Sequence, residues 1–186
     1  MGDKLPAIVR PEEGRVLHAF GQEVTILLDG ERTNGRLTAW INVNPPGDGP
    51  PPHYHSTEDE TFYVLDGRAA FLVNDEWHEL GPGGSAFMPH GSIHTFKNVG
   101  DQPLQMLIMT VPSGFEKFFC RCHDEFAKPG GPDMSRVVQI SAKNTESIFF
   151  KANRIPKRLN QQAMAVDCLV ESRRSKGLLD RRCWQQ

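Results

Sequence analysis

The chain has 186 residues, of which 38% are hydrophobic, and a formal net charge of −2; this suits one compact domain and excludes a chain that is disordered throughout. The charge leaves no basic excess to attract nucleic acid. No apolar run approaches the roughly 20 residues that span a bilayer, and residues 1–10 lack the apolar core of a secretion signal. We therefore expect a cytoplasmic protein without nucleic-acid or membrane partners, in which the four cysteines stay reduced.

Composition divides the chain into four segments. We expect an N-terminal arm over residues 1–14, a β-structure over 15–112, a helix and a final strand packed on it over 113–150, and a basic tail over 151–186. The tail carries nine Lys/Arg against three Asp/Glu, so it has a net charge of +6. Solvated charge is the usual outcome for such a run, and binding of an acidic partner is the alternative.

Short runs rich in β-branched and aromatic residues, separated by turn formers, fill the second segment, as in a sandwich or barrel. Asp-Gly and Asn-Gly pairs favour tight hairpins, because these residues tolerate a positive φ, so neighbouring strands should be antiparallel. The strands are expected at 15–20, 23–29, 35–43, 53–56, 60–66, 68–73, 76–80, 85–88, 93–99 and 103–111.

A helix is predicted directly after Pro112. Ser113 is a candidate cap, and a Gly/Pro break over 129–132 ends the helix. Apolar residues follow at three- and four-residue spacing, and we expect this stripe to lie on the outside of the β-structure: Phe115, Phe118, Phe119, Cys122 and Phe126. The apolar spacing over 163–170 predicts a second, marginal helix.

Five of the seven histidines lie between residues 53 and 94. In an extended strand, His53 and His55 point to the same face and can reach one point. A bend over residues 56–59 would turn Glu60 to that face, and His94 would join from a neighbouring strand. Three imidazoles and a carboxylate suit one divalent transition metal, which we expect to be Fe, Mn, Ni, Co, Cu or Zn. The alternative is a set of hydrogen-bonded histidines in a protein that has lost its metal.

Two further combinations are not expected to bind metal. His78 lies on an outer hairpin strand by its spacing, and His90 precedes the turn that leads to His94. Cys120 and Cys122 point about 200° apart on a helix, which prevents both from chelating one zinc ion.

The candidate ligands lie within two longer motifs. Residues 47–67 have the pattern G-x5-H-x-H-x4-E-x6-G, and residues 83–98 have the pattern G-x5-P-x-G-x2-H-x3-N. Both resemble the two motifs of the cupin superfamily at every defining position. The resemblance implies a single antiparallel jelly-roll β-barrel with a metal at its centre, held by His53, His55, Glu60 and His94.

Within the superfamily, the chain looks like the monocupin quercetin 2,3-dioxygenases, because an aromatic helix directly follows the barrel. That resemblance implies a metal-dependent dioxygenase that opens the ring of a flavonol, or a similar enolisable aromatic substrate, with O2. Glu60 would then be both a ligand and the acceptor of the substrate proton, which makes it the catalytic residue. The family also implies a homodimer, paired through N-terminal strands.

Strand parity predicts the lining of the substrate pocket. Phe62 and Val64 share the face of Glu60, and Phe96 shares that of His94. If no bulge changes the register, three further residues join them, and Trp40 lies at the rim: Phe87, Met106 and Ile108.

Two other functions are compatible with the sequence. A non-oxidative metal enzyme, such as an isomerase or decarboxylase, would need polar residues near the metal, and only Arg68, Asn42 and Gln105 are candidates in the predicted strands. A small-molecule-binding cupin without turnover would keep the pocket and lack the reaction.

Overall fold

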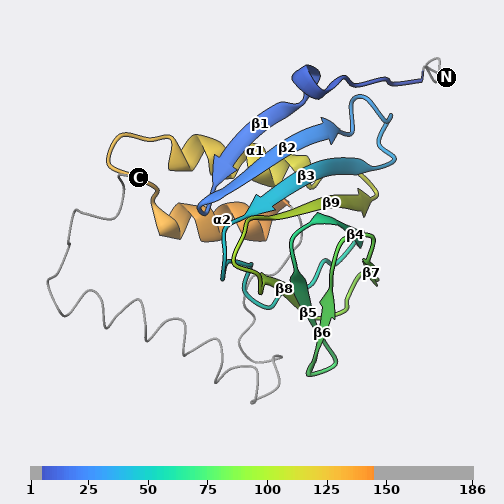
Figure 1. Cartoon of the computed structure of the whole chain (residues 1–186). Coiled ribbons are helices and arrows are strands. Elements are labelled where there is room, and N and C mark those ends of the chain that lie inside the picture. The colour runs from blue at the N-terminus through green and yellow to red at the C-terminus, as the bar shows by residue number, and fades with distance from the viewer. Residues whose placement is uncertain (1–5, 145–186) are drawn as a thin grey trace, which may run out of the picture. The chain divides into compact units, whose positions relative to one another are not determined.

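The computed structural model describes residues 6–144, which form nine strands, a short 3-10 helix over Pro11–Glu13 and two α-helices (Figure 1). Contacts divide the chain into two units, Met1–Phe150 and Lys151–Gln186, and the described residues belong to the first. The expected helix over 163–170 and a final strand ending at 150 lie outside these residues. The strands are β1 (Arg15–Ala19), β2 (Gln22–Leu28), β3 (Thr38–Asn44), β4 (Asp59–Asp66), β5 (Ala69–Val73), β6 (Glu76–Leu80), β7 (Ser85–Met88), β8 (His94–Asn98) and β9 (Leu104–Val111).

The strands form two antiparallel sheets, which confirms the predicted jelly roll. The larger sheet has the order β1-β2-β3-β9-β4-β7, and the smaller has the order β6-β5-β8. Their buried faces meet in one core, where Phe62 of β4 packs edge-on against Phe71 of β5 and against Phe96 of β8. The two sheets are hydrogen-bonded separately, so the jelly roll is a pair of facing sheets and not a closed cylinder.

The strand predicted over 53–56 is reduced to one isolated bridge, between His53 and His94. Residues 50–52 are all prolines, which have no N–H to donate to a ladder, so pairing cannot begin before His53. The parity argument nevertheless holds, because His53 and His55 are buried and Tyr54 between them is more exposed.

Helix α1 (Glu116–Phe126) covers the inner face of the large sheet, not its outside as predicted. Its aromatic side chains pack on Trp40 of β3, with ring centroids 5.4 Å from Trp40 for both Phe115 and Phe119. The small sheet has only three strands and leaves part of this face uncovered, so α1 takes its place near β1 to β3 (Figure 1). Ser113 does not cap the helix, which begins after Phe115 without a side-chain cap.

A second helix, α2 (Met134–Asn144), packs against α1 and was missed in the sequence. Val137 on this helix is buried in the core. The signal for the helix is Asp133, whose carboxylate accepts hydrogen bonds from the backbone N–H groups of Ser135 and Arg136.

Candidate metal centre

Four buried side chains meet between the two sheets. His53 and His55 come from the loop after β3, Glu60 from β4 of the large sheet and His94 from β8 of the small sheet. Each offers one ligand atom, and these four atoms all lie within 4.8 Å of one another. The exposed fraction is at most 7% for any of the four residues, so the cluster lies inside the protein.

Backbone hydrogen bonds hold the histidine loop in place. His53 and His94 exchange both N–H···O bonds, each 2.9 Å long, and the N–H of Gly91 donates to the carbonyl oxygen of His55 at 2.6 Å. Gly91 has a φ of 79°, a conformation that favours glycine, in the turn that leads into β8. The loop and the turn therefore position three imidazoles toward one point.

Two of the imidazoles are oriented by backbone carbonyl groups. Nδ1 of His53 lies 2.9 Å from the carbonyl oxygen of Pro51, and Nδ1 of His94 lies 3.0 Å from that of Ser92. Because a carbonyl oxygen only accepts, Nδ1 must carry the proton in both rings. The neutral tautomer then leaves Nε2 as the nitrogen that can bind a metal, which is a common arrangement around metal-binding histidines.

The carboxylate of Glu60 lies between the other ligand atoms. Its Oε2 is 3.1 Å from Nε2 of His55 and 3.1 Å from Nε2 of His94. When Nδ1 of His94 donates to a carbonyl group, its neutral Nε2 is an acceptor that faces another acceptor, and only a proton or a cation makes this contact favourable. The donor set, three imidazole nitrogens and one carboxylate oxygen, thus fits a divalent transition metal.

Burial and charge shift the pKa values of these groups. Burial, aided by the neighbouring imidazoles of His94 and His55, lowers the pKa of His53 to about 3, so this ring is neutral near pH 7. For His55, burial acts to lower the pKa, but the hydrogen bond and the charge of Glu60 outweigh it and raise the pKa. Burial acts to raise the pKa of Glu60, yet the hydrogen bonds with His55 and His94 lower it, and the carboxylate is ionised.

Most of the predicted pocket residues lie on the inner face near this cluster. The ring centroid of Phe62 is 6.1 Å from that of His94. At most 6% of any of the following side chains is exposed: Phe62, Val64, Phe96, Met106 and Ile108. Whether they contact a substrate stays a prediction.

Two of the predicted pocket positions are wrong. Phe87 is 60% exposed, because the register of β7 against β4 pairs it with Thr61 and turns Met88 inward, opposite Glu60. Trp40 is not at a rim; it is 1% exposed beneath α1. The sequence pattern also did not indicate that Phe115 reaches the cluster, where its ring centroid lies 5.0 Å from that of His55. The helical spacing had identified Phe115 as apolar but had assigned it to the outside.

The histidines and cysteines that were not expected to bind metal lie outside the cluster. His78 is exposed on β6, and the ring of exposed His90 bonds to Asp59 at 2.7 Å. Cys122 is buried on α1, and burial raises the pKa of its thiol to about 12, so this thiol stays protonated.

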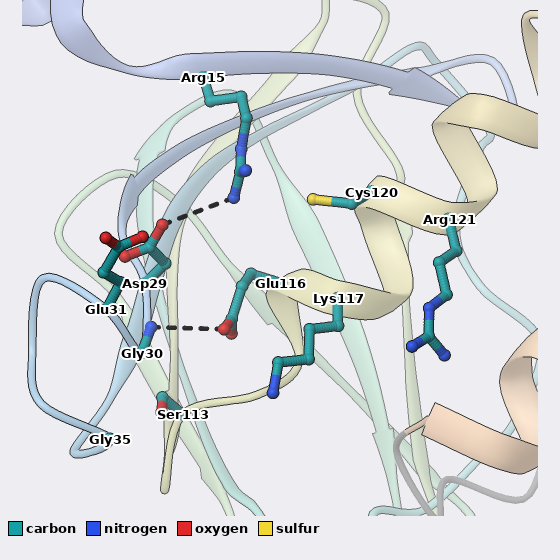
Figure 2. Close-up of a pocket in the computed structure, with 10 residues that line it drawn as sticks. All are labelled: Arg15, Asp29, Gly30, Glu31, Gly35, Ser113, Glu116, Lys117, Cys120 and Arg121. Atoms are coloured by element: carbon teal, nitrogen blue, oxygen red, sulfur yellow. Dashed lines mark hydrogen bonds and ion pairs between the residues drawn. The ribbon is translucent and has the colours of Figure 1, made fainter.

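A separate pocket of about 530 Å³ lies between the start of α1 and the end of β2, where Figure 2 shows its charged lining, including Arg15, Asp29 and Lys117. Buried Glu116 is one of its lining residues and accepts hydrogen bonds from the N–H of Gly30 at 3.3 Å (Figure 2) and from Oγ1 of Thr38 at 2.5 Å. The carboxylate is thereby satisfied, and the hydroxyl group of Thr38 has a defined partner.

Two facing antiparallel sheets with three histidines and one glutamate between them define a jelly-roll protein with an internal candidate metal site. A family model described as "Cupin domain" matches residues 40–110, which include all four of these residues. The match assigns residues 40–110 to a cupin domain, in agreement with the resemblance of the two motifs to those of cupins. Within the described residues, none of the helices has the length and apolar character needed to cross a membrane.

Several curated proteins are similar to this chain over part of its length. The chain is 32% identical over 60 residues to an uncharacterised protein of Methanocaldococcus jannaschii, which covers 32% of this chain and 48% of that protein. It is 47% identical over 49 residues to oxidoreductase OpS7 of Beauveria bassiana, and this match covers 26% of this chain and 16% of that protein. It is 29% identical over 96 residues to quercetin 2,3-dioxygenase of Bacillus subtilis, and this match covers 51% of this chain and 28% of that protein. The chain thus spans about half the length, or less, of these relatives.

Solved structures share the fold. KdgF from Halomonas sp. superimposes with a TM-score of 0.51 at 19% identity, covering 57% of this chain and 94% of that chain. A protein from Thermotoga maritima, described as a predicted oxalate decarboxylase, superimposes with a TM-score of 0.50 at 25% identity. This match covers 57% of this chain and 99% of that chain.

Proposed function

We propose that this cupin binds one divalent transition-metal ion through His53, His55, Glu60 and His94 and uses it in an oxygenase reaction on a small enolisable aromatic substrate. The observation that carries the proposal is the buried set of three imidazoles and one ionised carboxylate, whose ligand atoms lie within 4.8 Å of one another. A flavonol that is opened by O2, as in quercetin 2,3-dioxygenases, is the substrate class we favour, because the chain is 29% identical to one such enzyme over 96 residues.

The residues of the chain have separate tasks in this reaction. A bound ion would act as a Lewis acid for the substrate oxygen. Glu60 takes the proton from the substrate hydroxyl group onto its carboxylate, which leaves the substrate as an enolate ready to react with O2. Oε2 of Glu60 is the atom that faces His55 and His94, so we assign the proton to Oε1.

Aromatic side chains surround the candidate ligands and exclude water. The ring of Phe115 packs edge-on against His55, and that of Phe62 packs edge-on against His94. An apolar lining of this kind favours a planar aromatic substrate over a sugar or a dicarboxylate.

A non-oxidative reaction on a polar substrate is the second candidate. It is motivated by the protein described as a predicted oxalate decarboxylase, which matches at 25% identity. Of the three polar residues that could serve it, Arg68 pairs with Glu79 at the surface and Gln105 is exposed. Asn42 faces inward but bonds to the side chains of Gln22 and Asn44. The described residues therefore offer such a substrate little polar lining.

Metal content and oxygen uptake test the proposal together. Protein purified without added metal should contain a transition metal by elemental analysis, and samples reloaded with each of Fe, Mn, Ni, Co, Cu and Zn should be screened with a flavonol panel. We expect His94→Ala to lose the metal, and His78→Ala, which changes an exposed histidine outside the cluster, to behave as wild type.

Glu60→Gln separates the two tasks of the carboxylate. It keeps the shape and removes the base, so kcat should fall by about 10²- to 10⁴-fold while flavonol affinity changes far less. Oxygen uptake by none of the six fully loaded samples would reject the oxygenase, and turnover of a polar acid instead would favour the second candidate. Ligand binding without any turnover would identify a non-catalytic binding protein.

A further inference from the structure

The outer face of the large sheet carries apolar side chains at positions where a sheet face in water normally carries polar ones. Two rows of directly paired residues cross this face. The first row consists of Val16, Thr25, Ile41, Leu107, Tyr63 and Ser85. The second row consists of Ala39, Met109, Thr61 and Phe87. Neither row contains a charged residue, so the middle of the face is uncharged.

Alternation along the strands shows that these side chains point away from the core. On β4, Phe62 is 1% exposed on the inner face, whereas Tyr63 and Leu65 are 42% and 41% exposed. Val111 on β9 is 53% exposed, and Val16 on β1 is 49% exposed. The part of the chain that the structure describes therefore leaves this apolar face open to solvent. Contiguous apolar surface that spans several strands marks an interaction site on a soluble protein.

The face is large enough for a stable protein interface. Six strands at a spacing of about 4.8 Å span roughly 25 Å, and the eight residues of β4 and of β9 extend about 26 Å along the strands. Side chains that project from the sheet add to the accessible area of this footprint. The total is on the scale of the about 800 Å² that each partner contributes to a standard interface.

Shape and charge favour a second copy of this chain as the partner. A twisted sheet is complementary in shape to another sheet of the same twist, and two such sheets pack face to face about 10 Å apart. In a twofold symmetric dimer the same patch is used by both copies, so residues near the axis meet their own counterparts. A charged residue there would oppose its like charge, and the two rows contain none.

We propose that two copies of this chain pair through the outer faces of their large sheets. The inference goes beyond the proposed function and does not depend on it, because Glu60 points to the inner face and each copy keeps its own candidate metal centre. The contact lies on the sheet face and not on the N-terminal strands that the family resemblance implies. Phe87 lies on the edge strand β7, at the rim of the contact, where single side chains contribute little.

Sedimentation equilibrium of the full chain measures the pairing. Wild type should have twice the chain mass of 20.9 kDa. Tyr63→Glu and Val111→Glu each bring two carboxylates into the apolar contact, one from each copy. Because opposed like charges are strongly unfavourable in a desolvated contact, each substitution should raise the Kd of the dimer at least about a hundredfold.

Two matched substitutions introduce the same charge at exposed apolar residues elsewhere. Trp77→Glu changes a residue that is 46% exposed on β6 of the small sheet, and Ile8→Glu changes a residue that is 87% exposed in the N-terminal arm. Both should keep the wild-type Kd. Circular dichroism checks that every variant is folded, which we expect because Tyr63 and Val111 face solvent in a single copy.

The outcomes assign the face to one partner or overturn the pairing. A wild-type chain that stays monomeric, or a dimer that withstands both Tyr63→Glu and Val111→Glu, would overturn it. Loss of the dimer in Ile8→Glu alone would assign the contact to the N-terminal arm. A monomer that binds phosphatidylcholine vesicles, and loses this binding in Tyr63→Glu, would assign the face to a membrane surface instead. None of these results depends on metal or oxygen uptake, so the pairing and the proposed function can fail separately.

Discussion

At the scale of single residues, His53 shows how the fold prepares a ligand. The carbonyl group of Pro51 holds the proton on Nδ1, and burial lowers the pKa of the ring to about 3. A metal ion requires the neutral form of imidazole, so the ring is ready to bind over the whole physiological pH range. The same burial makes the metal-free protein sensitive to acid.

The expected pH dependence has a definite sign. In the unfolded chain His53 takes up a proton below its ordinary pKa of about 6.5, whereas in the folded protein it does so only near pH 3. Between these values the unfolded state binds one more proton, so stability falls as pH falls, by at most about 1.4 kcal/mol per pH unit from this group. Glu60, with its lowered pKa, adds a loss only below about pH 4.5.

Urea unfolding of metal-free protein at pH 7, 6 and 5 measures this effect. His55 opposes it, because its raised pKa stabilises the folded state at low pH, so the comparison with His53→Gln is needed to isolate one residue. We expect a smaller loss of stability toward pH 5 in His53→Gln than in wild type. Equal slopes in the two proteins would show that the fold does not exclude a proton from His53.

At the scale of elements, α1 completes the inner layer that the small sheet leaves open. Phe115, Phe118 and Phe119 form one aromatic group with Trp40 of the large sheet, and Phe115 extends it to His55. The helix is thus part of the wall of the site as well as of the core. Damage to its packing should affect both stability and ligand affinity.

Phe119→Ala tests the contribution of α1 to folding. Removal of a buried ring from this aromatic group should lower the free energy of unfolding by about 3–5 kcal/mol, as for other Phe→Ala changes in cores. Phe87→Ala is the matched control, because that ring is 60% exposed, and it should change stability by no more than about 0.5 kcal/mol. Chemical denaturation measures both, and similar losses in the two variants would contradict the inward packing of α1.

At the scale of the whole domain, the candidate ligands come from both sheets and from one loop. Glu60 belongs to the large sheet and His94 to the small one, while His53 and His55 lie on the loop that joins β3 to β4. The sheets share one apolar core, and an isolated bridge joins His53 of the loop to His94 of the small sheet. An ion bound by all four residues would tie the sheets together in the folded state alone, because the unfolded chain separates the ligands.

Metal should therefore stabilise the domain by mass action. At a free metal concentration of one hundred times Kd, the free energy of unfolding should rise by about 2.7 kcal/mol, and a chelator should reverse the gain. Thermal unfolding with and without chelator measures it, and His94→Ala should respond to neither treatment. A midpoint that is independent of metal in wild type would argue against the metal centre.

Much of the fold was determined by the sequence alone. Nine of the ten predicted strands are present in the described residues to within a few positions, because alternation and turn residues are local signals. The exception, 53–56, follows three prolines that prevent regular pairing. The identity of the clustered residues was also predictable, since the spacing of His53, His55, Glu60 and His94 determines which of them share a face.

Only the tertiary structure decided what covers each face and which polar atoms are left without partners. Helical spacing identified the apolar stripe of α1 but not the face of the sheet on which it packs. Packing on the inner face and packing on the outer face would bury the same helix residues. The outward turn of Phe87 depends on its register with β4, and the unpartnered hydroxyl group of Thr110 depends on strands that are far apart in the chain. Local sequence determines the spacing of apolar residues along each helix or strand. The register between strands and the face on which a helix packs depend instead on contacts between elements.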